Sequence, residues 1–398
     1  MKLFLLIAFV IFFLFPVALI AQTKTRSKQQ KIIIIMMDGF GEDYYRNSDM
    51  PTLNYFEKHG IYKVVPSLMP SVTNVNNTSI CTGVLPEKHG ITGNSFFNTA
   101  SDAEEFMEDD SLVLAPTIFE RAKKEAVRSI LFSSKKKTIG LLDKGTDEVI
   151  SPETASPLWI QRIGTVPSIY SREVNYWLMQ AALYSIKNDP GLGVIYIHIT
   201  DYPMHTWAPE SVESKEHLNK IDSYIAQISK AAPDAGILIT ADHGVNHKNF
   251  CWDLGKACTN RNTPVKIAIS PERDKYFKHH RGFGGTAYVY LKDQNDQEKV
   301  TATLLSLKGV EAVLTKKEAA EKFHLMPGRI GDLIVLGDKN TVFGDLDTES
   351  EILPATYRSH GSLYDANVPL FVYHALNAPA GGYFDFNYKL AAWLFTAK

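Results

Sequence analysis

The chain has 398 residues, of which 45% are hydrophobic and 22% are charged. This composition is typical of a folded globular protein and excludes a disordered or fibrous one. Lys and Arg number 42 and Asp and Glu number 44, so the net charge of −2 does not indicate binding to a nucleic acid duplex. Three cysteines are too few for a disulfide framework or a Cys-rich zinc module.

The first 21 residues are typical of an export signal. Lys2 supplies a positive charge before an unbroken apolar run over residues 3–20. Ala18 and Ala21 fit the small-residue cleavage pattern before Gln22. We therefore predict a signal peptide over residues 1–21 and a periplasmic or secreted mature protein. The same run is long enough to span a bilayer, so an uncleaved membrane anchor is the alternative.

Beyond the signal, strand-length apolar runs alternate with helical patterns. The predicted strands cover residues 31–37, 193–200, 235–240, 286–291, 332–336 and 368–373. The predicted helices cover residues 50–59, 115–125, 171–187, 214–232 and 388–397. Runs that are apolar throughout suit strands buried on both faces of a sheet. The alternation predicts an α/β fold with an open, mostly parallel sheet flanked by helices.

Two stretches fit this alternation less well and divide the predicted core into three parts. Residues 30–100, 191–280 and 346–398 are assigned to the α/β core. Residues 101–190 show few strand patterns and are interpreted as a cap or insertion. Residues 281–345 follow the order strand, helix, strand, helix, strand, which predicts a small α+β subdomain packed on the main sheet.

Aspartate and histidine recur where the predicted core strands end. Asp38 follows the first strand, Asp201 and His205 follow the strand that ends at residue 200, and Asp242 and His243 follow the next. In open α/β sheets, functional groups gather at the carboxyl ends of the strands. Carboxylate and imidazole groups are ligands of Zn²⁺ and similar divalent ions. The pattern therefore predicts a metal site at this edge of the sheet.

Residues 66–97 read PSLMPSVTNVNNTSICTGVLPEKHGITGNSFF. This stretch, together with the strand-end residues, resembles the alkaline phosphatase superfamily. Within it the chain is similar to the nucleotide pyrophosphatase/phosphodiesterase branch, and most of all to phosphonoacetate hydrolases. The resemblance implies an alkaline-phosphatase-like fold, with Thr73 as the catalytic nucleophile and Asn94 as a catalytic and substrate-binding donor to the phosphoryl group.

The resemblance also implies two divalent metal ions as cofactors. We expect zinc, and Mn²⁺ or Fe²⁺ would accept the same ligands. The ion that activates the nucleophile would be held by Asp38, Thr73, Asp242 and His243. The other ion would be held by Asp201, His205 and a late histidine, His360, in the sequence RSHG.

Further motifs within the branch favour a phosphonoacetate hydrolase. The sequence TNVNN over residues 73–77 is similar to the pattern of those enzymes, whereas phosphodiesterases more often have histidine where Asn77 stands. The pair His279-His280 before a Gly-rich turn is also similar. In SSKKK, Lys135 and Lys137 match a K-x-K element whose lysines contact the substrate carboxylate. For the residues alone, a solvated basic turn is the alternative.

We therefore expect hydrolysis of phosphonoacetate to acetate and phosphate through a phosphothreonine. The alternative is a nucleotide pyrophosphatase, phosphodiesterase or phosphomonoesterase that uses the same site. Phe96 and Phe97 are candidates for stacking on a nucleobase in that case. A non-catalytic zinc-bearing binding protein is a third reading, and the intact set of nucleophile and ligands argues against it. The expected partner is a small phosphonate or phosphate ester, and the oligomeric state is left open.

The three cysteines allow two arrangements. Cys251 and Cys258 frame a short polar loop and either pair as a disulfide or remain free, since an exported protein meets oxidising conditions. Cys81 lies in an apolar stretch and is expected to be a small core residue.

Overall fold

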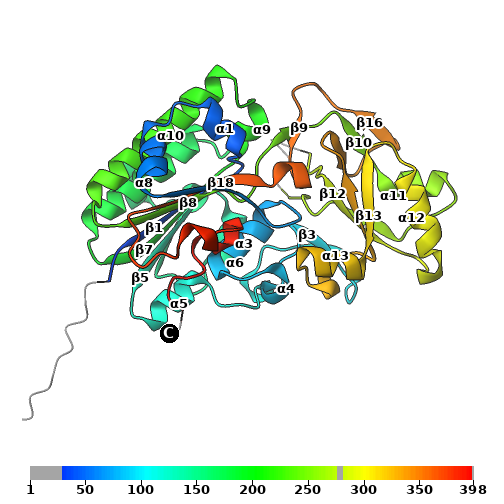
Figure 1. Ribbon diagram of the computed structural model, residues 1–398, viewed down its shortest axis with the longest axis horizontal. Coiled ribbons are helices and arrows are strands. Elements are labelled where there is room, and N and C mark those ends of the chain that lie inside the picture. Colours follow the sequence, from blue (N-terminus) through cyan, green and yellow to red (C-terminus); the bar gives the residue numbers. More distant parts are fainter. Residues whose placement is uncertain (1–28, 276–280, 397–398) are drawn as a thin grey trace, which may run out of the picture.

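The computed structural model describes residues 29–275 and 281–396, and Figure 1 shows them as two lobes side by side. The larger lobe carries the N-terminal and C-terminal parts of the described chain. The smaller lobe is built from the yellow and orange segments. The predicted signal peptide over residues 1–21 and the pair His279-His280 lie outside the described residues.

A seven-stranded sheet forms the centre of the larger lobe, in the order β2-β18-β8-β1-β7-β5-β6. Every neighbouring pair is parallel except those of β18, which runs antiparallel to both β8 and β2. The strands are β1 (Ile32–Met37), β2 (Ile61–Pro66), β5 (Arg128–Ser133), β6 (Glu148–Ile150), β7 (Leu192–Ile199), β8 (Gly236–Thr240) and β18 (Asn367–Tyr373). This mostly parallel sheet confirms the predicted fold class.

Helices cover both faces of the sheet, which explains why its central strands are apolar throughout (Figure 1). All six residues of β1 are buried. One face is covered by α1 (Glu42–Asn47), α2 (Pro51–His59), α8 (Glu173–Asn188) and α10 (Val212–Ala231). The other face carries α3 (Thr73–Thr82), α5 (Ile118–Lys124) and α6 (Lys136–Leu142).

Short elements connect these layers. They are α4 (Pro86–His89), α7 (Pro157–Ile163), α9 (Tyr202–Thr206), the hairpin of β3 (Ser95–Asn98) with β4 (Ala103–Phe106), and the pair of β9 (Asn246–His247) with β17 (Arg358–Ser359). The β9–β17 pair is important for the site, because His360 directly follows β17 and is positioned by this pairing.

The interpretation of residues 101–190 as a cap or insertion is wrong for most of that stretch. It supplies β5 and β6 to the central sheet and α8 to one of its covering layers. The strands were missed because β6 has only three residues and β5 mixes arginine and serine with its apolar positions.

The predicted helix over residues 388–397 is also not formed. The structure has a short 3-10 helix, η7 (Asn387–Leu390), followed by turns. Asn387 is buried and donates to Asn76 Oδ1 and to the Ala241 carbonyl, each at 3.1 Å. Phe395 has a φ of 55°, which is incompatible with a right-handed helix. Tertiary contacts therefore override the local helical pattern.

The smaller lobe contains two sheets and begins before residue 281, the predicted boundary. Its antiparallel sheet has the order β11-β12-β14-β13, and a second sheet has the order β15-β10-β16. The strands are β10 (Phe250–Trp252), β11 (Ile267–Ile269), β12 (Thr286–Tyr290), β13 (Val310–Thr315), β14 (Leu333–Gly337), β15 (Thr341–Phe343) and β16 (Ser350–Ile352). Its helices are α11 (Leu254–Asn260), α12 (Gln297–Leu305) and α13 (Lys316–Phe323).

All three cysteines are free thiols and are buried. Cys251 and Cys258 belong to different apolar clusters of the smaller lobe, so the disulfide alternative is not realised. Cys81 is packed in the main core, as expected.

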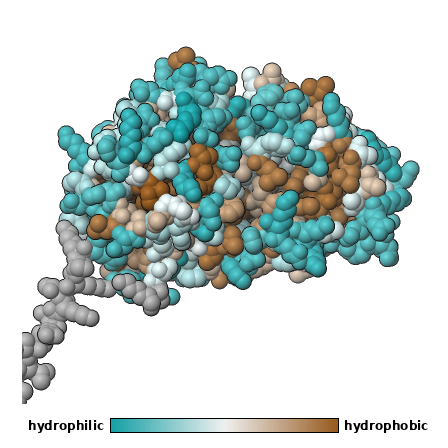
Figure 2. Space-filling view, viewed as in Figure 1, coloured by the Kyte–Doolittle hydropathy of each residue, from teal (hydrophilic) through white to brown (hydrophobic). Residues whose placement is uncertain are grey.

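Polar residues cover most of the visible surface, and hydrophobic residues gather on the smaller lobe near β13 (Figure 2). Among the described residues, no helix combines the length and apolarity needed to cross a membrane.

Candidate active site

The predicted strand-end residues meet at one edge of the central sheet. Asp38 follows β1, Asp201 follows β7, and Asp242 follows β8, and these three strands are neighbours in the sheet. All three residues are at most 1% exposed. Gly39 adopts a φ of 73°, and a Cβ there would lie 3.0 Å from the Cβ of Asp201. Glycine therefore lets the turn after Asp38 approach Asp201 closely.

A first cluster of ligand-type atoms forms around His243. Its Nε2 lies 3.4 Å from Asp38 Oδ1 and 3.6 Å from Asp242 Oδ2. Thr73 Oγ1 lies 3.3 Å from the same nitrogen. Thr73 begins α3, and Asn77, one turn later, donates to Asp242 Oδ2 at 3.0 Å. The helix thus places a hydroxyl beside two carboxylates and an imidazole, and its N-terminus favours an anion there.

A second cluster lies beside the first. His205 and Asp201 are separated by four positions at α9, and His205 Nε2 lies 3.1 Å from Asp201 Oδ2. His360 follows β17, and its ring stacks on that of His243 with the centroids 3.5 Å apart. The centroids of His205 and His360 are 5.4 Å apart. The structure therefore brings together every residue that was predicted as a metal ligand.

The three histidines of these clusters present the same nitrogen to the site. In each, Nδ1 contacts a backbone carbonyl: His205 that of Arg358 at 2.9 Å, His243 that of Gly244 at 3.1 Å and His360 that of Ser71 at 2.9 Å. A carbonyl only accepts hydrogen bonds, so Nδ1 carries the proton and Nε2 carries the lone pair. Histidines that bind metals are commonly oriented in this way.

The electrostatics of the site fit divalent cations. Burial and Asp201 act to raise the pKa of Asp38, but Lys135 and the histidines outweigh them and hold it well below its usual range. Burial, together with the charge of Asp38, raises the pKa of Asp242 well above its usual range. Asp38 Oδ1 is buried and has no hydrogen-bond partner among the described residues. Buried carboxylates and imidazoles of this kind are suitable ligands for divalent cations.

Asn94 lies at the start of the β3 hairpin and is 3% exposed. Its Oδ1 accepts from the backbone N–H of Asn74 at 3.1 Å, next to the nucleophile candidate Thr73. Its Nδ2 donates to the Glu272 carbonyl at 3.2 Å. The structure places the Asn94 side chain beside the N-terminus of α3, which is where a donor to a phosphoryl group at Thr73 is needed.

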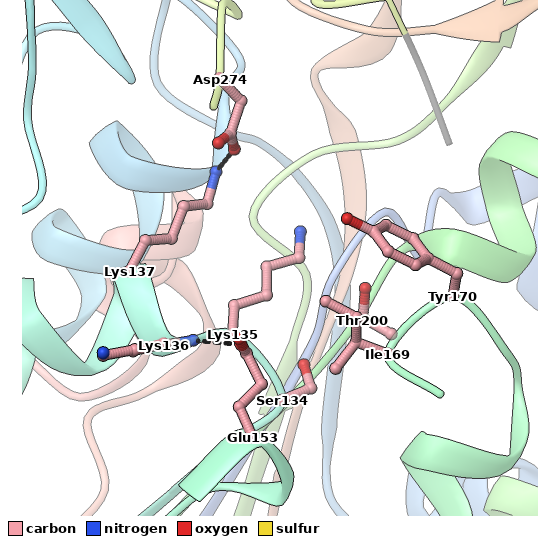
Figure 3. Close-up of a pocket in the computed structure, with 9 residues that line it drawn as sticks. All are labelled: Ser134, Lys135, Lys136, Lys137, Glu153, Ile169, Tyr170, Thr200 and Asp274. Carbon is pink, nitrogen blue, oxygen red and sulfur yellow. Dashed lines mark hydrogen bonds and ion pairs between the residues drawn. The ribbon is translucent and has the colours of Figure 1, made fainter. Parts of the chain in front are cut away.

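The predicted lysines lie at the beginning of α6 and line a pocket with about 380 Å³ of empty space (Figure 3). Lys135 Nζ lies 2.6 Å from Asp38 Oδ2 and 2.8 Å from Asp201 Oδ1. Burial opposes the charge, but Asp201 and Asp38 raise the pKa of Lys135 well above its usual range. Lys137 is buried and forms an ion pair with Asp274. The alternative of a solvated basic turn is therefore wrong for both lysines.

The other side of this pocket is formed by Tyr170, Ile169 and Thr200. Figure 3 shows the Tyr170 hydroxyl pointing toward the ammonium group of Lys135. Lys136 points away from both lysines and is exposed. All three lysines line the pocket, but the side chain of Lys136 is exposed and extends away from the other two, whereas Lys135 and Lys137 are paired with carboxylates.

The model of the type I phosphodiesterase / nucleotide pyrophosphatase family matches residues 32–363. The chain belongs to this family. Its members are hydrolases of a two-metal type, in agreement with the two clusters of ligand atoms. Membership accounts for the order of the site residues along the chain, since the match runs from β1 to just beyond His360.

Solved structures and curated relatives agree with this family. Phosphonoacetate hydrolase from Sinorhizobium meliloti 1021, in complex with phosphonoacetate, matches with a TM-score of 0.83 and 27% identity over 92% of this chain and 95% of that one. Murine ectonucleotide pyrophosphatase/phosphodiesterase 5 has the same fold, with a TM-score of 0.63 and 16% identity over 87% of this chain and 88% of that one. Mouse bis(5'-adenosyl)-triphosphatase enpp4 is 27% identical over 62% of this chain and 54% of its own length. The chain thus spans about half the length of such curated relatives.

Sequence reasoning missed two buried residues of the site. His198, on β7, lies with its Nε2 3.2 Å from Asp38 Oδ2 and its Nδ1 3.0 Å from Ser133 Oγ. A histidine inside an apolar strand beside β1 was the available signal. Glu272 lies with Oε1 2.8 Å from His360 Nε2. No sequence motif marks Glu272, since its place in the site results from how the smaller lobe folds back to His360.

Proposed function

We propose that the protein hydrolyses the carbon–phosphorus bond of phosphonoacetate to acetate and phosphate, through a phosphothreonine on Thr73. The observation that carries this proposal is the pocket at the start of α6, where Lys135 lies directly beside the metal-ligand carboxylates of Asp38 and Asp201 and Lys137 lines the same pocket. The similarity to a phosphonoacetate hydrolase with bound phosphonoacetate over nearly the whole chain supports it.

The pocket has the right position for a carboxylate carried by a phosphonate. In phosphonoacetate a single methylene separates the carboxylate from phosphorus. A phosphoryl group beside Thr73 therefore puts its carboxylate within a few bond lengths of the metal ligands. Lys135 Nζ, which is already within 3 Å of Asp38 and Asp201, lies at that distance. A larger leaving group such as a nucleotide does not need two lysines there.

We propose zinc for both ions, held by the two clusters of ligand atoms described above, and Mn²⁺ or Fe²⁺ as possible substitutes. When bound, such ions lower the pKa of a neighbouring hydroxyl and hold phosphoryl oxygens in place. The helix N-terminus at Thr73 and the amide of Asn94 supply further positive potential for the phosphoryl group.

In the first step Thr73 Oγ1 attacks phosphorus, an oxygen–phosphorus bond forms and the carbon–phosphorus bond breaks. The released electron pair passes from the methylene carbon to the carboxylate oxygens, and the carbon then takes up one proton, which balances the proton that the Thr73 hydroxyl gives up, to form acetate. Lys135 and Lys137 stabilise the negative charge that grows on those oxygens. In the second step water attacks the phosphorus of the phosphothreonine, which releases phosphate and restores the Thr73 hydroxyl.

Replacing Lys135 with alanine is expected to lower kcat/KM for phosphonoacetate by roughly 10²–10³-fold, the usual cost of losing one donor to a developing anion. Lys137→Ala should have a smaller effect, because Asp274 already neutralises much of the Lys137 charge. Lys136→Ala is the matched control and should leave kcat/KM nearly unchanged, because this lysine is exposed. Steady-state kinetics with metal content measured on each variant provide the comparison.

The same variants should be assayed with a phosphonate monoester that carries no carboxylate. If the lysines recognise the carboxylate, Lys135→Ala loses far more activity on phosphonoacetate than on the ester. An equal loss on both substrates would show that Lys135 acts only through Asp38 and Asp201, and the carboxylate assignment would be wrong.

A nucleotide pyrophosphatase/phosphodiesterase activity is the second candidate, because the curated relatives named above include a bis(5'-adenosyl)-triphosphatase. A phosphomonoesterase would use the same residues. The structure removes one argument for a nucleotide substrate: Phe96 and Phe97 are 6% and 4% exposed. Phe97 packs against Tyr290 with the ring centroids 5.1 Å apart. Both residues are core positions, so neither is a stacking platform.

We further propose that the mature protein acts outside the cytoplasm. The support is the charged, apolar and small-residue pattern of residues 1–21. N-terminal sequencing of the protein from a cell fractionation would show a start at Gln22 in the periplasmic or secreted fraction. A start at Met1 in the membrane fraction would favour the anchor instead.

A further inference from the structure

Glu272 brings a carboxylate from the smaller lobe to the second cluster of ligand atoms. It lies in the loop that follows β11 and is 2% exposed. The other members of that cluster, Asp201, His205 and His360, lie outside this loop. Glu272 is therefore an additional acidic group at a place where the sequence predicts three ligands.

The contact between Glu272 and His360 has the character of two ligands that face a common cation. Glu272 Oε1 lies 2.8 Å from His360 Nε2. His360 Nδ1 already donates to the Ser71 carbonyl, so Nε2 carries a lone pair. Within the described residues Nε2 makes no hydrogen bond, although it is buried. An oxygen and a nitrogen lone pair repel one another at this distance unless a proton or a metal cation lies between them.

His205 completes the arrangement. Ligand atoms of His205, Glu272 and His360 lie within 4.8 Å of one another, and all three residues are buried. His205 Nδ1 donates to a backbone carbonyl, so its Nε2, which lies 3.1 Å from Asp201 Oδ2, carries a lone pair on the side of the cluster. Two imidazole nitrogens and one carboxylate oxygen form a set that divalent transition metals accept.

The backbone at Pro271 and Glu272 is held by Asn94 and is closely approached by Gly284. The backbone N–H of Asn94 donates to the Pro271 carbonyl at 2.7 Å, and Asn94 Nδ2 donates to the Glu272 carbonyl at 3.2 Å. On the other side, a Cβ on Gly284 would lie 2.6 Å from the Glu272 Cβ. These contacts hold the backbone of Glu272 beside Asn94, at the edge of the site.

We propose that Glu272 is a fourth protein ligand of the second metal ion, together with Asp201, His205 and His360. The extra carboxylate adds negative charge and an oxygen donor, so this position accepts Mn²⁺ or Fe²⁺ in place of Zn²⁺ more readily than a three-ligand set does. It also links the two lobes through the ion. The inference concerns metal binding and is independent of which substrate is hydrolysed.

Metal titration of the full-length mature protein tests this assignment. The unaltered protein is expected to hold two ions per chain at a buffered concentration of Mn²⁺ or Zn²⁺. Glu272→Gln keeps the shape of the side chain. It should lower the affinity for the second ion by roughly 10–100-fold and leave the affinity for the first ion unchanged. Glu272→Asp keeps the charge but shortens the side chain by one methylene. Its affinity for the second ion should lie between that of Glu272→Gln and that of the unaltered protein.

Asp274→Asn is the matched control, because Asp274 is a buried carboxylate two residues further along and pairs with Lys137. It should retain both ions with unchanged affinity. Thermal melting in the presence of a chelator shows whether each variant folds. Two ions bound to Glu272→Gln as tightly as to the unaltered protein would overturn the proposal, and so would an equal loss in Asp274→Asn. Because substrate turnover is not measured, failure of the phosphonoacetate proposal would leave this result intact.

Discussion

Replacing Thr73 with alanine is expected to lower kcat/KM by at least about 10⁴-fold, because the variant has no hydroxyl to attack phosphorus. Thr73 Oγ1 is positioned by the first turn of α3 and lies 3.3 Å from His243 Nε2, inside the first cluster of ligand atoms. Rapid quenching followed by mass spectrometry of the intact protein should show one added phosphoryl group in the unaltered protein and none in Thr73→Ala.

Two further variants separate loss of the nucleophile from damage to the helix. Thr73→Ser keeps a hydroxyl and should retain measurable turnover and the phosphoryl adduct. Thr82→Ala removes a threonine from the last position of the same helix and should remain active. A phosphoryl adduct on Thr73→Ala, or turnover close to that of the unaltered protein, would show that another group is the nucleophile.

Removal of the metal ions is expected to abolish turnover and to destabilise the fold. Asp38, Asp201 and Asp242 are buried within one site, where the charge of Asp201 acts to raise the pKa of Asp38 and the charges of Asp38 and Asp201 act to raise the pKa of Asp242. Bound cations relieve this repulsion. An ion present at about 1,000 times its Kd adds about 4 kcal/mol to the free energy of unfolding.

Denaturant unfolding with and without a chelator measures the effect of the ions. The unfolding midpoint should fall on chelation and return when Zn²⁺, Mn²⁺ or Fe²⁺ is added back. The ion that restores turnover best identifies the working metal. Asp242→Asn serves as a control, because it removes a ligand of the first ion and should show a smaller response to chelation. An unchanged midpoint in the unaltered protein would contradict the assignment of this cluster as a metal site.

The strand-end residues could be predicted because their signal is local. Each of Asp38, Asp201 and Asp242 follows a strand that is almost entirely apolar, and parallel neighbours bring such ends together. The fold class follows from the same runs. Thr73 and His360 required the resemblance to a family, since neither has a distinctive local pattern of its own.

The remaining features depend on contacts between distant segments. β6 has three residues and becomes a strand only because β5 lies beside it. The end of the chain has a helical pattern, yet the buried hydrogen bonds of Asn387 hold it in another conformation. Glu272 belongs to a polar loop with no motif, and its role arises from packing between the lobes. Periodicity and spacing carry no information about such contacts.

For Lys135 and Lys137, the sequence predicts the positions but not the surroundings. Their spacing matches a motif, but their surroundings differ from one another in a way that the sequence does not show. Lys135 contacts two metal-ligand carboxylates, whereas Lys137 is neutralised by Asp274. The unequal effects expected for the two alanine variants follow from this difference.

The most direct test of the account is the product analysis of phosphonoacetate incubated with the purified, metal-loaded protein. We predict that acetate and phosphate appear in equal amounts, with a kcat/KM above that for bis-p-nitrophenyl phosphate and for the p-nitrophenyl ester of thymidine monophosphate. Rapid release of p-nitrophenol from either ester, without acetate from phosphonoacetate, would contradict the account and show that the site serves a phosphodiesterase.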